Sequence, residues 1–136
     1  MLQFHPKQGT ILICDFKGLC EPEMVKVRPV IVVSPKLKHR DNLCTVIPLS
    51  TTPPHEIMPY HYELRDLHLP YPFDSDVCWA KCDMIYTVSF GRLSLFKNGR
   101  GPDGKRKYTY TCLKTDQMFV LADKILYGIG IHSFVK

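Results

Sequence analysis

The sequence has no run of apolar residues long enough to cross a bilayer. The first seven residues contain no long apolar segment of the kind found in secretion signals, and nowhere do about 20 apolar residues follow one another, as a membrane-spanning helix requires. Repeats, low-complexity tracts and a composition typical of disorder are missing as well. We therefore expect a cytoplasmic protein without a membrane partner.

Strong charge of either sign is also missing. The net charge of +5 and the isoelectric point of about 8.9 are only mildly basic, which favours an anionic partner without identifying one. The 136 residues are 45% hydrophobic and 23% charged, as in ordinary globular proteins. We expect one domain over residues 1–136 that buries its own core without disulfides.

The six cysteines lack the patterns that would assign them a chemical role. Without a secretion signal the thiols are expected to stay reduced. Four of them lie in strand-like runs and are expected to be buried: Cys14, Cys44, Cys78 and Cys112. Cys78, Cys82 and His68 resemble only a fragment of a zinc site, because the two-residue spacing and a second ligand pair are missing. No metal or other cofactor is expected.

Short apolar runs separated by proline and glycine predict a mainly β fold. The expected strands cover residues 10–16, 30–34, 43–49, 60–64, 77–81 and 85–88, with a turn or a single helical turn at 82–84. Residues 30–33 are four β-branched residues in a row, which predicts a buried strand. Pro29 cannot donate to a strand ladder, so we expect it at the first position of that strand.

A basic hairpin and one helix are expected near the carboxyl end. Residues 93–96 and 107–112 are predicted to pair across a loop with Asn-Gly and Asp-Gly turn signals, which makes 97–107 the hairpin segment. A helix over about 115–128 follows, with Thr115 as N-cap, apolar residues every three or four positions, and Gly128 or Gly130 at its end. The expected architecture is a small, strongly bent sheet or barrel with one helix packed on it.

Two strand ends carry side chains suited to phosphate chemistry. Arg28 precedes Pro29, which favours an extended backbone, and a guanidinium offers a planar fork of donors that fits phosphate. Ser50 and Thr51 follow the apolar run that ends at residue 49, and hydroxyls there can donate to a phosphoryl oxygen. Taken singly, each has a plain alternative: a surface ion pair for the arginine, and a turn that binds its own backbone for the hydroxyls.

In their order, these motifs resemble the PemK/MazF family of toxin endoribonucleases. The matching residues are Gly9-Thr10-Ile11, Asp15-Phe16, Glu23, Arg28-Pro29-Val30, Val32-Val33-Ser34, Val46-Ile47-Pro48-Leu49-Ser50-Thr51, Asp83, Thr87-Val88 and Arg92-Leu93. The resemblance spans about residues 6–93 and the helix, and is closer still to a YifN-like subgroup that shares the basic hairpin. It implies an SH3-like barrel, a homodimer with single-stranded RNA at the subunit interface, and a cognate antitoxin that occupies the groove.

The resemblance also implies which residues act. Arg28 matches the family's catalytic arginine. Ser50 matches its hydroxyl residue, but the family usually has threonine there, so Thr51 stays an alternative. Glu23 matches an acidic residue that precedes the arginine and is a candidate base. The implied reaction is metal-independent attack by the RNA 2′-hydroxyl, which needs a proton acceptor, a proton donor and donors to the phosphoryl oxygens. Arg28 suits the last of these tasks, because a guanidinium keeps its charge.

Seven basic residues are candidates for RNA binding: Lys26, Lys36, Lys38, Arg100, Lys105, Arg106 and Lys107. Four of them lie in the hairpin, followed by Tyr108 and Tyr110, and positive charge next to aromatic rings can hold a single strand. A solvated hairpin tip has the same composition. His55 and His61 follow the hydroxyl cluster and are further candidates for the site.

A second functional hypothesis is a binding module without catalysis on the same fold, which holds RNA, DNA or another protein such as a topoisomerase. One reason to keep it open is Met84, which stands where many family members carry glutamine. A thioether cannot replace the hydrogen bonds of an amide.

Overall fold

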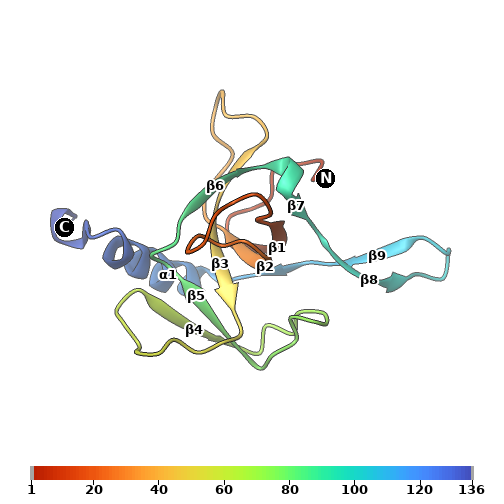
Figure 1. Cartoon of the computed structure of the whole chain (residues 1–136). Helices are drawn as coiled ribbons and strands as arrows, with labels where there is room; N and C mark the ends of the chain where they lie inside the picture. The colour runs from red at the N-terminus through yellow and green to blue at the C-terminus, as the bar shows by residue number, and fades with distance from the viewer. Residues whose placement is uncertain (1, 136) are drawn as a thin grey trace.

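A computed structural model describes residues 2–135, except for the side chain of Thr109, and Figure 1 shows its architecture. The strands are β1 (Thr10–Asp15), β2 (Val27–Val32), β3 (Leu43–Ser50), β4 (His61–Arg65), β5 (Val77–Lys81), β6 (Tyr86–Ser89), β7 (Leu93–Ser94), β8 (Phe96–Arg100), β9 (Arg106–Thr109) and β10 (Thr111–Cys112). The helices are η1 (Phe90–Arg92), α1 (Thr115–Gly128) and η2 (His132–Phe134). None of these helices is long and apolar enough to span a membrane.

Eight strands form one antiparallel sheet that curls strongly into a half-barrel. Its main path is β10-β1-β2-β3-β5-β4, with β7 added on β1 and β6 added on β3. One edge of β1 is divided between β7 at Ile13–Cys14 and β10 at Thr10–Ile11. β3 pairs with β6 over its first half and with β5 at Leu49 and Ser50. This confirms the predicted bent, mainly β fold with one helix.

The central strands are buried on both faces, which explains their continuous apolar runs. In β2, Val30 and Val32 belong to one core cluster and Ile31 belongs to the other. The second cluster also contains Leu121, so α1 covers that face of the sheet. Half-buried Met118 and Ile125 pack against the same cluster and continue the predicted apolar face of the helix.

The predicted start of the second strand is wrong. β2 begins at Val27, three residues before the β-branched run, and Pro29 is its third residue, paired with Ile13 of β1. The ladder between β2 and β3 starts only at Val30, after the proline. Arg28 is therefore the second residue of the strand, and its backbone is held by pairing with Cys14.

The predicted hairpin forms, but its strands pair closer to its tip than expected. β8 pairs with β9, from Phe96 opposite Thr109 to Arg100 opposite Arg106. β7 and β10, which were expected to pair with each other, both pair with β1 instead. The paired segment is thus an arm of two strands that extends from the half-barrel on the side away from α1 (Figure 1).

The helix has the predicted extent, but its N-cap is Lys114, and Thr115 is the first helical residue. The Lys114 N–H donates to Oε1 of Gln117 at 2.8 Å, so a side chain one turn later satisfies a free donor at this end. Gly128 is the last helical residue, and Gly130 lies just beyond with φ +73°, in the left-handed region that glycine favours.

Candidate active site

Arg28 brings an unpaired donor to one end of β2. Its Cα lies opposite that of Cys14, and the alternation of a strand places it on the same face as Val30. The side chain is half-buried, and its Nε is buried without a hydrogen-bond partner. The ion pair found in residues 2–135 joins Arg65 and Glu63 and does not involve Arg28. A buried unpaired donor costs about 1–3 kcal/mol, so an acceptor supplied by a ligand would be favourable here.

A pocket of about 260 Å³ opens beside Arg28. Its wall comes from the loop between β1 and β2, with two carboxylates, Glu21 and Glu23, and two cations, Lys26 and Arg28. The charged groups are exposed except for the half-buried arginine. Both an acceptor of protons and donors to an anion are therefore present at this end of β2.

Glu23 is partly committed to its own loop. Its Oε1 accepts a hydrogen bond of 2.9 Å from the Cys20 N–H, and the backbone N–H of Glu23 donates to the Cys20 carbonyl at 2.8 Å. The loop turn therefore fixes the carboxylate, while the second oxygen has no hydrogen bond within the described residues. Glu23 lines the pocket beside Arg28, as the proposed role of base requires.

Two side chains from distant segments brace this loop. Nη1 of Arg92 donates to the carbonyls of Asp15 at 2.9 Å and Lys17 at 2.8 Å. The Met24 N–H donates to the Tyr86 hydroxyl at 3.0 Å. Arg92 was part of the family resemblance, but its bracing role was not predicted, and nothing in the sequence pattern around Tyr86 indicated this contact.

Ser50 and Thr51 differ sharply in their environments. Ser50 ends β3, pairs with Trp79 of β5 and is only 5% exposed. Its hydroxyl accepts the Thr52 N–H at 3.1 Å and donates to the Thr52 carbonyl at 3.5 Å. Thr51 is exposed. The structure thus gives Ser50 the local bonding of a turn former, and Thr51 the hydroxyl that faces solvent.

The sheet brings the arginine and the hydroxyl segment to the same end. β2 and β3 are antiparallel, with Val30 opposite Pro48. Counted two residues further, this register sets Arg28 opposite Ser50, on the same face. The ladder stops at Val30 and Pro48, and from Leu49 onward β3 pairs with β5. Arg28 and Ser50 therefore lie where the two strands part.

The predicted site residues do not all meet in one pocket, because neither Ser50 nor Thr51 is among the residues that line the pocket beside Arg28. Lys36 and Lys38 are exposed in the loop after β2, at the strand end opposite Arg28. At about 3.3 Å per residue, even the end of β2 lies more than about 10 Å from Arg28 along the strand. His55 is exposed in the loop after β3, and Nδ1 of half-buried His61 already accepts the Met58 N–H at 2.9 Å. Of the non-hairpin cations predicted to bind RNA, only Lys26 lines the pocket beside Arg28.

The thiols fit no chemical site. Burial raises the pKa of Cys14 and Cys82 to about 12 and that of Cys44 to about 11, and it also raises the pKa of Cys78. The prediction that Cys112 is buried is wrong, because it lies on the short edge strand β10 and is exposed. Within residues 2–135, no three His, Cys, Asp or Glu side chains are placed to hold a metal ion.

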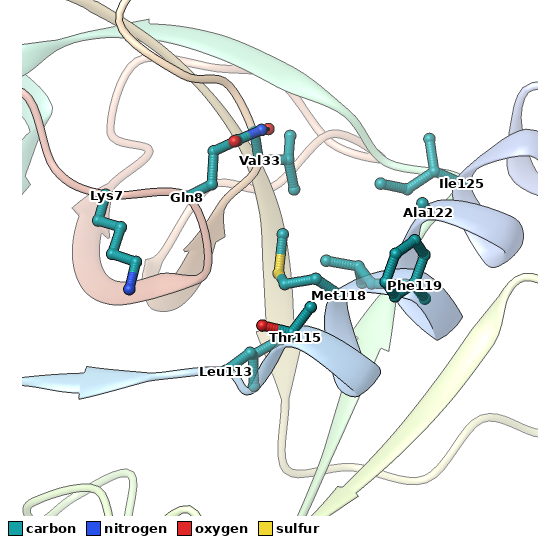
Figure 2. A pocket seen from close by; sticks show the side chains of 10 residues that line it. Lys7, Gln8, Val33, Leu113, Thr115, Met118, Phe119, Ala122 and Ile125 are labelled. Carbon is teal, nitrogen blue, oxygen red and sulfur yellow. The ribbon is translucent and has the colours of Figure 1, made fainter.

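A second, apolar pocket lies against α1 (Figure 2). It has a volume of about 450 Å³, and Met118, Ala122 and Ile125 of the helix line it together with Val33 and Gln8. No carboxylate, imidazole or thiol is among the residues that line it. Lys7 is the one ionisable residue that lines it, and Val33 places the pocket beyond the end of β2 that is opposite Arg28.

Comparisons with known proteins show the family of this chain. A family model described as a PemK-like, MazF-like toxin of type II toxin-antitoxin systems matches residues 7–123. The protein YifN of Escherichia coli (strain K12) is 33% identical over 158 aligned positions, which cover 99% of both chains.

Solved structures show the same fold. MazF from Deinococcus radiodurans superposes with a TM-score of 0.63 at 17% identity, over 94% of this chain and 99% of that one. A mycobacterial endoribonuclease in complex with its cognate antitoxin gives 0.60 at 16% identity, over 93% and 97%. At such identities these structures establish the fold alone.

Proposed function

This chain belongs to the PemK-like, MazF-like toxin family, and from this premise we propose that it is a toxin endoribonuclease that cleaves single-stranded RNA without a metal. The observation that carries the proposal is the buried, unpaired Nε of Arg28 beside a pocket that also holds carboxylates. An RNA phosphate is an anion that can supply the missing acceptor. The relatives' names support the same class of activity.

The proposed reaction is attack of the RNA 2′-hydroxyl on the neighbouring phosphorus. A bond forms between O2′ and phosphorus, the bond to the 5′-oxygen breaks, and the products carry a 2′,3′-cyclic phosphate and a 5′-hydroxyl. The Glu23 carboxylate accepts the proton of the 2′-hydroxyl, a solvent water gives a proton to the departing 5′-oxygen and regains one from Glu23, and the Arg28 guanidinium donates to the nonbridging oxygens as their charge grows. Lys26, which lines the same pocket, neutralises the adjoining phosphate.

The structure favours Thr51 over Ser50 as the hydroxyl that contacts substrate. Thr51 is exposed, whereas the Ser50 hydroxyl is buried and engaged twice by Thr52. In this scheme Ser50 is a positioning residue that shapes the turn, and Thr51 donates to the phosphate.

Met84 was one reason to keep the non-catalytic alternative open. This side chain packs against the core cluster that contains Val30, and it does not line the pocket beside Arg28. The exchange of glutamine for methionine therefore removes no group from this pocket and is no argument for the binding module over the nuclease.

Regulation follows from the same proposal. We place the protein in the cytoplasm as a homodimer whose activity a cognate antitoxin silences; the antitoxin bound to the mycobacterial relative supports this partner class. Co-expression with the product of a neighbouring small gene should relieve growth arrest if that product is the antitoxin.

The decisive experiment incubates the purified protein with a long single-stranded RNA in the presence of EDTA. Distinct fragments with 5′-hydroxyl ends are expected, and Arg28→Ala should lower the cleavage rate by about a hundredfold or more. Arg65→Ala is the matched control, because it removes an exposed arginine paired with Glu63 outside the pocket. RNA retained in a gel shift without fragments, by a folded protein, would overturn the nuclease and establish the binding module.

A further inference from the structure

The positive charge of the chain is concentrated in one protruding element. The arm, residues 96–109, comprises β8, β9 and the turn between them. It contains five cations, Lys97, Arg100, Lys105, Arg106 and Lys107, and one acid, Asp103. This is a net charge of +4 in a chain whose total is +5. The half-barrel and α1 are almost neutral, and the arm extends away from them (Figure 1).

The charges of the arm are not neutralised by the protein itself. Arg100 lies directly opposite Arg106, and like charges in that position destabilise a strand pair. Arg100 donates from Nη1 to the Gly104 carbonyl at 2.9 Å, which uses one of five donors. Asp103 accepts the backbone N–H of Lys105 at 3.0 Å. Within residues 2–135, no carboxylate forms an ion pair with any cation of the arm.

An exposed aromatic ring lies on the same face as these arginines. Arg106 and Tyr108 are two residues apart on β9 and so point to one face, while Lys97 lies opposite Tyr108 and Arg100 opposite Arg106. β8 has one more residue than β9 between these two pairs, and a β-bulge between Lys97 and Arg100 accommodates it. Lys97 and Arg100 therefore both lie on that face. The arm therefore presents three cations and a tyrosine, 44% exposed, on one side.

A cavity lies at the base of the same face. It has a volume of about 470 Å³, and Lys97 and Tyr108 line it together with Phe4 and Leu95. Phe4 is 48% exposed. A flat aromatic wall with an ammonium group beside it suits a nucleotide, whose base stacks while its phosphate meets the cation.

We propose that this face of the arm binds single-stranded RNA outside the cleaved phosphodiester. Tyr108 stacks on a base at the cavity, and Lys97, Arg100 and Arg106 contact successive phosphates. The inference rests on the proposed function, for which it supplies a second substrate contact. An acidic protein segment would also contact the cations, but it would give no role to the two exposed tyrosines, Tyr108 and Tyr110. RNA is therefore the better match.

Binding is measured by fluorescence anisotropy with a labelled RNA of about 20 nucleotides, in the Arg28→Ala background so that the probe stays intact. Arg100→Gln with Arg106→Gln should weaken binding at least about tenfold. It should also reduce the slope of log K against log salt by about 1.4, because each lost phosphate contact on a single strand contributes about 0.7. The control, Lys7→Gln with Lys114→Gln, removes the same charge from exposed residues outside the arm and should leave the affinity within about twofold.

The stacking contact has its own test. Tyr108→Leu keeps an apolar side chain but removes the ring, and should weaken RNA binding about tenfold. Tyr71→Leu is the control, since Tyr71 is exposed in the loop between β4 and β5. Circular dichroism melts accompany each variant, and a variant that fails to fold is replaced by Tyr108→Phe, which should bind like the wild type because the ring remains.

The outcomes separate this inference from the proposed function. If the wild-type protein cleaves RNA and the arm variants bind RNA as tightly as their parent, only the proposal that the arm binds RNA is overturned. RNA binding that is lost in the arm variants, by a protein that never cleaves, would support the arm and overturn the nuclease. If the Arg28→Ala parent binds no RNA, the proposal that the arm binds RNA is overturned as well. Poly-glutamate bound as tightly as RNA, with the same losses in the variants, would overturn RNA as the ligand and indicate an acidic protein segment.

Discussion

The backbone N–H of Met24 donates a hydrogen bond of 3.0 Å to the hydroxyl of Tyr86. This contact joins the loop after β1 to strand β6, and Met24 is the neighbour of Glu23 in the wall of the pocket beside Arg28. Tyr86 is also packed against Phe16, with ring centroids 5.0 Å apart, so its hydroxyl is held in place by its ring. The position of Glu23 therefore depends on a side chain that does not line the pocket itself.

Tyr86→Phe should loosen this loop while leaving the barrel intact. The ring and its packing remain, so we expect a loss of about 1 kcal/mol in the free energy of unfolding from the single hydrogen bond. RNA cleavage should fall about tenfold through kcat, and amide hydrogen exchange in residues 20–25 should become faster. Tyr127→Phe, at an exposed position of α1, is the control. Unchanged exchange in the loop would contradict the bracing role even if activity fell.

The two hydroxyls at the end of β3 should respond in different ways to the same change. Thr51→Ala should lower kcat by about a hundredfold with little effect on stability, because it removes an exposed donor. Ser50→Ala should lower stability by about 1–3 kcal/mol, because the Thr52 N–H loses its acceptor at a buried position. Thr51→Ser should restore most of the activity.

Urea unfolding and cleavage rates measured on the same samples separate these two effects. Arg28→Ala supplies the reference, since it should lower the cleavage rate without lowering stability. A Ser50→Ala protein that unfolds like the wild type and yet does not cleave would show that Ser50, and not Thr51, contacts the phosphate.

Much of the fold was predictable because the strands carry a strong local signal. The β-branched run of β2 and the apolar run of β3 identified the centre of the sheet, and their order placed Arg28 and Ser50 at strand ends. That both lie at the same end of the sheet follows from the register of β2 and β3, which periodicity does not encode. The family resemblance, not the pattern of residues, supplied that expectation.

The incorrect predictions about strand pairing have one physical cause. Which strands lie side by side depends on tertiary contacts. β7 and β10 were expected to pair with each other, yet each finds a partner in β1, because the curled sheet divides that edge. For the same reason β2 extends back to Val27: β1 continues to Asp15 and offers it a ladder. Pro29 is tolerated inside the strand, since the ladder to β3 begins only after it.

Gly128 should be intolerant of substitution although it lies in a helix. A Cβ on this residue would overlap the carbonyl group of Cys82 and meet the Cα of Asp83 at 2.8 Å, and both are backbone atoms of the turn before β6. Alanine normally stabilises a helix by up to about 1 kcal/mol relative to glycine. Here we expect Gly128→Ala to destabilise the protein by about 1–3 kcal/mol, because the helix must shift away from the turn.

The urea midpoint of Gly128→Ala, measured at an unchanged m-value, is compared with the midpoint of the control variant Asp123→Ala. Asp123 is an exposed residue of the same helix, so its change should stay within about 0.5 kcal/mol of the wild type. Gly128→Ala with wild-type stability would mean that α1 does not press against this turn.

The buried thiols make stability depend on pH in the alkaline range. Burial raises the pKa of Cys82 from its ordinary value of 9.0 to about 12, and that of Cys14 equally. Above pH 9 the unfolded chain loses these protons while the folded chain keeps them, so the unfolded state binds fewer protons and the free energy of unfolding falls as pH rises. Below pH 8 both states hold the protons, and this contribution to pH dependence vanishes.

Each such thiol can contribute up to about 1.4 kcal/mol per pH unit between pH 9 and its folded pKa. Urea unfolding of the reduced protein at pH 8, 9, 10 and 10.5 measures the slope, and Cys82→Ala should make it shallower by up to that amount. Lysines and tyrosines also titrate there, but they are common to both proteins and cancel in the difference. Cys20→Ala, at an exposed position, is the control and should leave the slope unchanged. Equal slopes for wild type and Cys82→Ala would show that the thiol ionises as readily in the folded state as in the unfolded one, and that the contact between α1 and the Cys82 turn admits water.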